Sequence, residues 1–104
     1  NIKGNLATIR PEAELYYDGS SQMYATSTVN DDCGDVTSLF VDDTIQLAIA
    51  SAEARSGGIA TCYASPDAWA ISIPLKSDPE THWCVDNSSV AVSQADPVSS
   101  TECD

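Results

Sequence analysis

The sequence predicts an α+β fold in which a long N-terminal amphipathic helix packs on a small antiparallel sheet of three or four strands, with a disulfide-tied C-terminal loop. Apolar residues recur at helical spacing over residues 1–17, and the hydrophobic period changes from about 3.6 to about 2 residues after Gly57-Gly58. A polar stretch between Cys84 and Cys103 ends the chain. At 104 residues, we expect residues 1–104 to form a single domain with a modest core.

Residues 1–17 carry one apolar stripe, which we expect to be the C-terminal half of a long helix. Its packing face is Ile2, Leu6, Ile9, Ala13 and Tyr16 or Tyr17. Pro11 lacks an N–H and crowds the preceding turn, so we expect a kink at residues 7–11. Because the stripe begins at once, we expect the helix to continue upstream of Asn1. Asp18-Gly19-Ser20 should end it.

Residues 18–57 are rich in Ser, Thr, Asp and Gly at first and are expected to be a connecting loop with a short helix at 42–55. Asp42 or Asp43 suits the start of that helix, by capping and by charge. The double glycine should end it. The expected buried stripe is Val41, Ile45, Ala48, Ile49 and Ala52.

Residues 58–93 alternate apolar and polar side chains, as half-buried strands do. In "AWAISIPL", Ala68, Ala70 and Ser72 lie opposite the apolar face. We expect the N-terminal helix to cover that face, and Pro74 to mark an edge or a bulge. The expected sheet core is Trp69, Ile71, Ile73, Leu75, Trp83 and Val85.

Charge and cysteine content restrict the function classes. The sequence has sixteen acidic and four basic residues, so its formal net charge is −12. This charge argues against nucleic acid or an anionic membrane surface as a partner of this chain. No apolar run is long enough to span a membrane. Four cysteines without a CxxC pair favour two disulfides and an oxidising compartment over free thiols or a zinc site.

Catalysis is not expected, and neither is a cofactor or a metal. His82 is the single histidine and reads as an exposed strand residue. The pairs Asp31-Asp32 and Asp42-Asp43 are expected to solvate a loop and cap a helix rather than act as acid and base. A calcium site is a weaker alternative, for which the C-terminal loop offers Asp86, Asn87, Asp96, Glu102 and Asp104.

Two further patterns have an ordinary structural interpretation. Asn87-Ser88-Ser89 is an N-glycosylation sequon, and we expect it to be a turn. The tyrosines could form an aromatic relay, but packing at the end of the first helix is the favoured interpretation of Tyr16, Tyr17 and Tyr24.

Four stretches, in their order, resemble the soluble head of a bacterial type IV pilin or pseudopilin. They are "NLATIRPEAELYYDGSSQMY", "DDTIQLAIASAEA", "TCYASPDAWAISIPL" and "HWCVDNSSVAVS". The family's prepilin cleavage site is absent, and Pro11 departs from its usually uninterrupted helix.

The resemblance implies a structural subunit of a filament at the cell surface, serving adhesion, motility or DNA uptake. Other pilin subunits would be its partners in a homopolymer, joined through an apolar N-terminal half-helix that sits in the membrane before assembly. The isolated chain lacks that segment and is expected to be monomeric. The alternatives are a pseudopilin of a type II secretion system and a free secreted binding or adhesin module.

The expected disulfides are Cys33–Cys62 and Cys84–Cys103, although four cysteines allow three pairings. A turn at Asn87-Ser88 folds the chain back, so the tail beyond Ala95 can return to the sheet edge beside Cys84. Each bond would also order one weak segment, contributing roughly 3 to 4 kcal/mol through loop-closure entropy. We expect the polar loop to bury too little apolar area to order itself.

Overall fold

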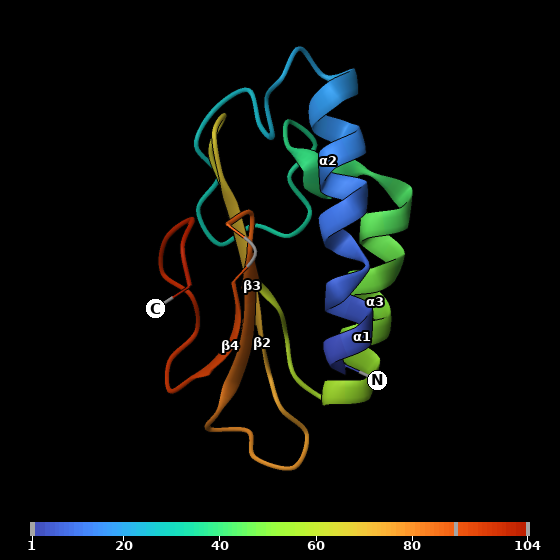
Figure 1. The fold of residues 1–104 in the computed structure, drawn as a ribbon. Coiled ribbons are helices and arrows are strands. Elements are labelled where there is room, and N and C mark those ends of the chain that lie inside the picture. Colours follow the sequence, from blue (N-terminus) through green and yellow to red (C-terminus); the bar gives the residue numbers. More distant parts are fainter. Residues whose placement is uncertain (1, 89, 104) are drawn as a thin grey trace.

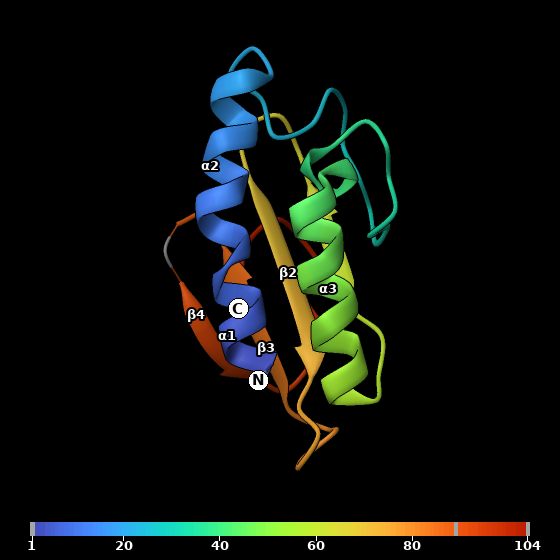
Figure 2. The same cartoon turned by 90° about the vertical axis from the view of Figure 1, so that its right-hand side faces the viewer.

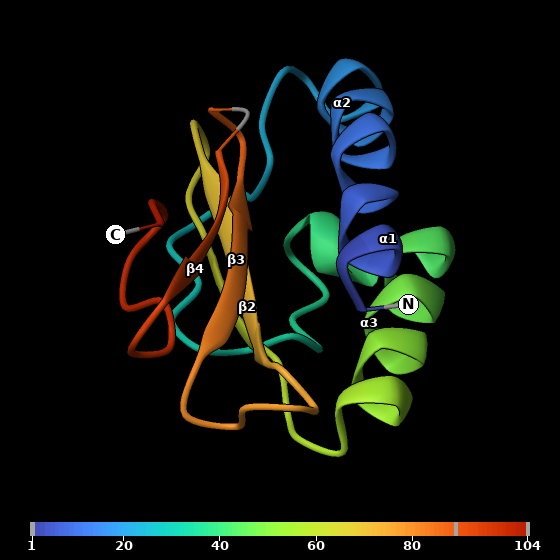
Figure 3. The same cartoon turned by 60° about the horizontal axis from the view of Figure 1, so that its bottom comes forward.

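The structure is a computed structural model that describes residues 2–88 and 90–103, and its fold is α+β. Three helices, α1 (Ile2–Ala7), α2 (Ile9–Gly19) and α3 (Asp43–Ser56), form one layer. A four-stranded antiparallel sheet forms the next layer, and the C-terminal segment lies on the far side of that sheet (Figures 1 and 3).

The N-terminal helix is interrupted at Thr8, within the window expected for a kink. Pro11 has no N–H to offer the carbonyl of Ala7, so the regular hydrogen-bond pattern cannot continue there. The Thr8 N–H donates to the Gly4 oxygen at 3.3 Å, and the Thr8 hydroxyl donates to the Asn5 oxygen at 2.7 Å. The chain therefore forms two consecutive helices, α1 and α2, instead of one.

Helix α3 begins and ends as its sequence predicts. The Asp42 carboxylate caps it by accepting the N–H groups of Thr44 and Ile45, and Gly57 ends it with a positive φ of 79°. Its buried residues are Ile45, Ala48, Ile49 and Ala52. Val41 was expected in this stripe but is 41 % exposed, because it ends the short 3-10 helix η1 (Leu39–Val41) before α3 begins.

The sheet is a meander with strand order β1-β2-β3-β4. Its strands are β1 (Thr61–Ala64), β2 (Trp69–Pro74), β3 (His82–Asp86) and β4 (Ala91–Gln94). Pro74 does not mark an edge strand, because β2 is central. The proline is tolerated there because β1 begins at Thr61, opposite Ser72, so residue 74 has no partner on that side.

Helix α3 shares the cover of the sheet with the N-terminal helices, where the N-terminal helix alone was expected to form it. Figure 2 shows α1 over β3 and β4, with α3 beside it over β2. Helix α3 brings a full apolar stripe of its own, and that stripe needs the same buried face. The shared core includes Leu6, Ile9, Ala13, Phe40, Ile45, Ile49, Trp69, Ile71, Ile73 and Val85.

The other sheet face is also covered, which corrects the expectation of a single apolar face with the tail at a sheet edge. Cys84 lies in β3, an inner strand, so its partner Cys103 reaches it across the face. Val98 is 2 % exposed and packs with Ala70 and Cys84 in a second, smaller cluster. The polar tail thus buries one apolar side chain, that of Val98, which its composition did not predict.

Candidate functional site

Both disulfides join a loop to the sheet. The bonds are Cys33–Cys62 and Cys84–Cys103, which is the expected pairing. Cys62 is in β1 and Cys84 in β3, and both are fully buried. Two such bonds indicate an oxidising environment, either outside the cell or in the periplasm.

The C-terminal segment is fixed at three points between Gln94 and Cys103. Val98 fills the small cluster on the sheet, and its N–H donates to the Ser72 hydroxyl at 2.9 Å. The Cys103 N–H donates to the Asp86 carboxylate at 3.0 Å, next to the disulfide. The segment is exposed before and between these points, at Asp96, Pro97, Ser99, Ser100 and Glu102. The result is a displayed polar surface on a fixed frame.

Two of the four basic residues hold the N-terminal helices to the sheet. The Lys3 ammonium lies 4.3 Å from the centre of the Trp83 ring. The Arg10 guanidinium donates to the backbone oxygens of Asp86, at 3.2 Å, and Val90, at 2.9 Å. Sequence reasoning missed both ties. The available signal was their spacing of seven residues, which puts them on one side of a helix, beside the apolar stripe.

Most residues of the two predicted packing faces lie in the core. On the helices, Leu6, Ile9 and Ala13 are fully buried, whereas Ile2 and Tyr16 are half-buried at its border. On the sheet, buried positions are Trp69, Ile71, Ile73 and Val85, and Trp83 is half-buried beneath Lys3. Leu75 differs: it follows the end of β2 and is only half-buried, because the strand ends at Pro74.

The tyrosines pack where the first helix meets the following loop. The rings of Tyr17 and Tyr24 are 4.7 Å apart between centroids. Tyr24 is 6 % exposed and its hydroxyl donates to the Glu14 carboxylate at 2.8 Å. Burial, with this hydrogen bond and the Glu14 charge, raises the pKa of Tyr24 well above its ordinary value. The cluster fixes the loop after α2 to the helix.

Several residues weighed as ligands are used by the fold. The Asp86 carboxylate accepts three backbone N–H groups, and the Asn87 side-chain oxygen accepts the Trp69 N–H at 3.3 Å. His82 is half-buried in β3. Of the remaining candidates, Asp96 and Glu102 are exposed, whereas Asp104 and the sequon residue Ser89 lie outside the described residues.

Over residues 2–88 and 90–103 the surface has no pocket, and no group of three or more His, Cys, Asp or Glu side chains is placed to hold a metal ion. Within the same ranges, no helix has the length and apolar character needed to cross a membrane.

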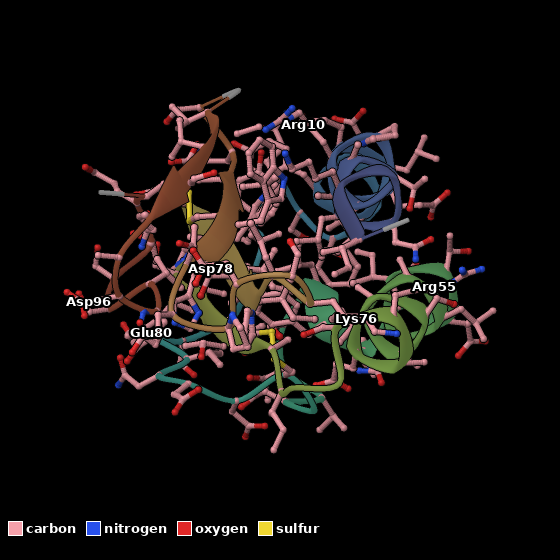
Figure 4. All side chains as sticks on the ribbon, turned by 90° about the horizontal axis from the view of Figure 1, so that it is seen from below. Arg10, Arg55, Lys76, Asp78, Glu80 and Asp96 are labelled. Atoms are coloured by element: carbon pink, nitrogen blue, oxygen red, sulfur yellow. A yellow bond between two sulfur atoms is a disulfide. The ribbon has the colours of Figure 1, made fainter. Side chains whose placement is uncertain are left out.

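Charged side chains are distributed unevenly at the end of the molecule where β2 and β3 are joined. Figure 4 shows Asp78, Glu80 and Asp96 on the side of the sheet and tail. Arg55 and Lys76 lie on the side of α3 in the same view. All five are exposed, so this end presents separate acidic and basic areas to solvent.

No protein-family model, curated protein or solved structure matches this chain.

Proposed function

We propose that this chain is the head domain of a pilin-like structural subunit, displayed on a filament at the cell surface. The observation that carries the proposal is the attachment of the N-terminal helices along the sheet. A filament subunit must transmit load between an N-terminal helix and the head. Here the N-terminal helices are joined to the sheet at three successive levels. These are the contact of Lys3 with Trp83, the buried side chains of α1 and α2, and the hydrogen bonds of Arg10 to the β3–β4 turn.

The C-terminal loop supports the same role. Its disulfide, Val98 and the Asp86–Cys103 hydrogen bond fix a segment in which most of the remaining side chains face solvent. A subunit that recognises a surface needs such a display: exposed polar groups on a backbone that does not fray. The fold is thus a packed helix–sheet body to which a disulfide ties the C-terminal loop. In this proposal, the helix leads to the filament core and the loop faces outward.

Subunit contacts are assigned to the outer face of the helix layer. Leu15 of α2 and Leu47 of α3 are 65 % and 69 % exposed, although each lies in an otherwise amphipathic helix. Burying a leucine side chain against a neighbour stabilises by roughly 1.5–3 kcal/mol. Without neighbours, the net charge keeps single heads apart and monomeric.

The sequence encoded upstream of Asn1 tests the proposal. We expect a short basic leader followed directly by about 20 apolar residues, the length that spans a bilayer. An ordinary cleaved signal peptide there would contradict it and would favour the second candidate, a free secreted binding module. Electron microscopy of the full-length protein then tests assembly. Leu15→Asp with Leu47→Asp should abolish filaments while the isolated head keeps its melting temperature.

A further inference from the structure

The two edges of the sheet differ in how their backbone groups are satisfied. At the β1 edge, the outward N–H and oxygen of Ala64 both bond to Val29, at 3.1 and 2.8 Å. The outward oxygen of Cys62 accepts the N–H of Asp32 at 3.1 Å. The Cys33–Cys62 disulfide holds this loop in place. The β1 edge is therefore closed by the chain itself.

Within residues 2–88 and 90–103, nothing covers the β4 edge in this way. Asp86 donates its N–H to the Val90 oxygen at 3.1 Å, which makes Cys84–Val92 and His82–Gln94 the hydrogen-bonded pairs of the β3–β4 ladder. The N–H and C=O groups of Ala91 and Ser93 must then point away from β3. Both residues are exposed, and no described residue bonds to their outward groups. The tail crosses the sheet face instead of pairing here.

The side chains and the register of β4 do not block an added strand, although the strand is only four residues long. Native edge strands are commonly blocked by a charged side chain, a proline or a bulge. The four residues of β4 are Ala, Val, Ser and Gln, paired in regular register with β3. Its small side chains leave the backbone accessible. Unpaired backbone donors and acceptors in this arrangement fit another extended chain.

We propose that the β4 edge, at Ala91 and Ser93, binds an extended basic segment of a partner protein, which adds antiparallel to β4. The charge defines the partner. The chain has a formal net charge of −12, and Asp96 follows β4 by two residues. Figure 4 places Asp78 and Glu80 at that same end of the sheet. An antiparallel segment would bring its N-terminal end there, so lysine or arginine belongs at that end.

A second copy of the chain fits this edge less well. Two β4 strands could pair antiparallel about Val92 with four backbone hydrogen bonds, but both copies would carry the same net charge of −12. Like-charge juxtaposition opposes such pairing and keeps copies apart. The inference goes beyond the filament role, because it concerns a surface that the proposed helix contacts do not use.

The test uses the oxidised protein and the peptide acetyl-Lys-Lys-Thr-Val-Thr-Val-amide, followed by amide NMR. We expect shifts centred on residues 91–94, and at least tenfold slower hydrogen exchange at the Ala91 and Ser93 N–H groups. Ser93→Pro removes an outward N–H that the ladder does not use, so binding should weaken at least tenfold. Ser93→Thr, the matched control, keeps the N–H and should bind as the unaltered protein does.

Two peptide controls separate the backbone contribution from the charge and remain usable if Ser93→Pro fails to fold. A peptide N-methylated at both threonines and valines, and one with Glu-Glu in place of Lys-Lys, should each bind at least tenfold more weakly. Shifts that map to another surface, absence of binding, or equal affinity of the N-methylated peptide would overturn the proposal. Sedimentation showing self-association that Ser93→Pro abolishes would assign the edge to a second copy instead.

Discussion

The carboxylate of Asp86 accepts the backbone N–H of Cys103 at 3.0 Å, which ties the end of β3 to the end of the chain, seventeen residues later. Asp86 is 2 % exposed, and its other carboxylate oxygen accepts the N–H groups of Ser88 and Val90. Its main-chain oxygen accepts Arg10 from α2. One buried residue thus joins the helix layer, the β3–β4 turn and the disulfide-tied tail.

Replacing Asp86 should destabilise the protein more than its single side chain suggests. Asp86→Ala leaves three backbone N–H groups without their acceptor, and we expect the free energy of unfolding to fall by about 2–4 kcal/mol. Asp86→Asn keeps one carbonyl oxygen and should lose less. Guanidinium unfolding measures both. Asp67→Asn, on an exposed turn, should change stability by less than about 0.5 kcal/mol; equal effects of Asp86→Ala and Asp67→Asn would contradict the assignment.

The C-terminal disulfide should stabilise the tail more than the body. Cys84→Ala with Cys103→Ala removes the crosslink across a sequence separation of 19, and we expect a loss of about 3 kcal/mol. Hydrogen exchange should quicken at Val98, while amides of α3 and β2 keep their protection. The matched variant, Cys33→Ala with Cys62→Ala, should instead expose the β1 edge at Ala64. Uniform loss of protection throughout the sheet after the first change would show that the tail belongs to the main core.

Local patterns predicted the elements, and long-range partners escaped them. The period of α3 and its Asp42 cap were readable because both depend on neighbours within one turn. The same periodicity wrongly assigned Val41 to α3, which begins only at Asp43, and Leu75 to β2, which already ends at Pro74. An apolar stripe predicts that one face of a helix is buried, but it does not identify the element that covers that face. The packing of both α1 and α3 on the same sheet was therefore not predictable.

The contacts that fix the C-terminal segment could not be predicted for the same reason. Asp86 and Cys103 are separated by many residues, and a hydrogen bond from a backbone N–H leaves no mark in the sequence of the donor. Val98 is a single apolar residue in a polar stretch, without a period to indicate its burial. The presence of two disulfides could be anticipated because cysteine, unlike these groups, signals its own chemistry, whereas their pairing had to be argued from where the chain was expected to turn.

Tyr24 should make the protein less stable at alkaline pH. Its folded-state pKa is raised by burial and by Glu14, so above about pH 10 the unfolded chain loses a proton that the folded protein keeps. The contribution of Tyr24 is therefore complete below that pH, and stability falls as the pH rises toward the folded-state pKa, by at most about 1.4 kcal/mol per pH unit. Unfolding measured from pH 8 to 11.5 should show this slope. Tyr24→Phe should flatten it; an unchanged slope would place the titration elsewhere.

Arg10 should control how firmly the N-terminal helices hold the β3–β4 turn. Arg10→Met keeps the aliphatic stem but loses the hydrogen bonds to the Asp86 and Val90 oxygens, and we expect a loss of about 1–3 kcal/mol. Arg10→Lys keeps the charge, yet a single ammonium cannot reproduce the planar fork that reaches both oxygens, so most of the loss should remain. Arg55→Met removes an exposed cation from the last turn of α3 and is the matched control.

The location of the change distinguishes this tie from a general charge effect. In Arg10→Met, amide exchange should quicken first at Val90 and Asn87 and along α2, whereas β1 and α3 stay protected. In Arg55→Met, any loss should be limited to the end of α3 and remain below about 1 kcal/mol. If both variants lost the same stability, or if Arg10→Lys behaved as the unaltered protein, the net charge of the chain and not the geometry of the guanidinium would account for the contribution of Arg10.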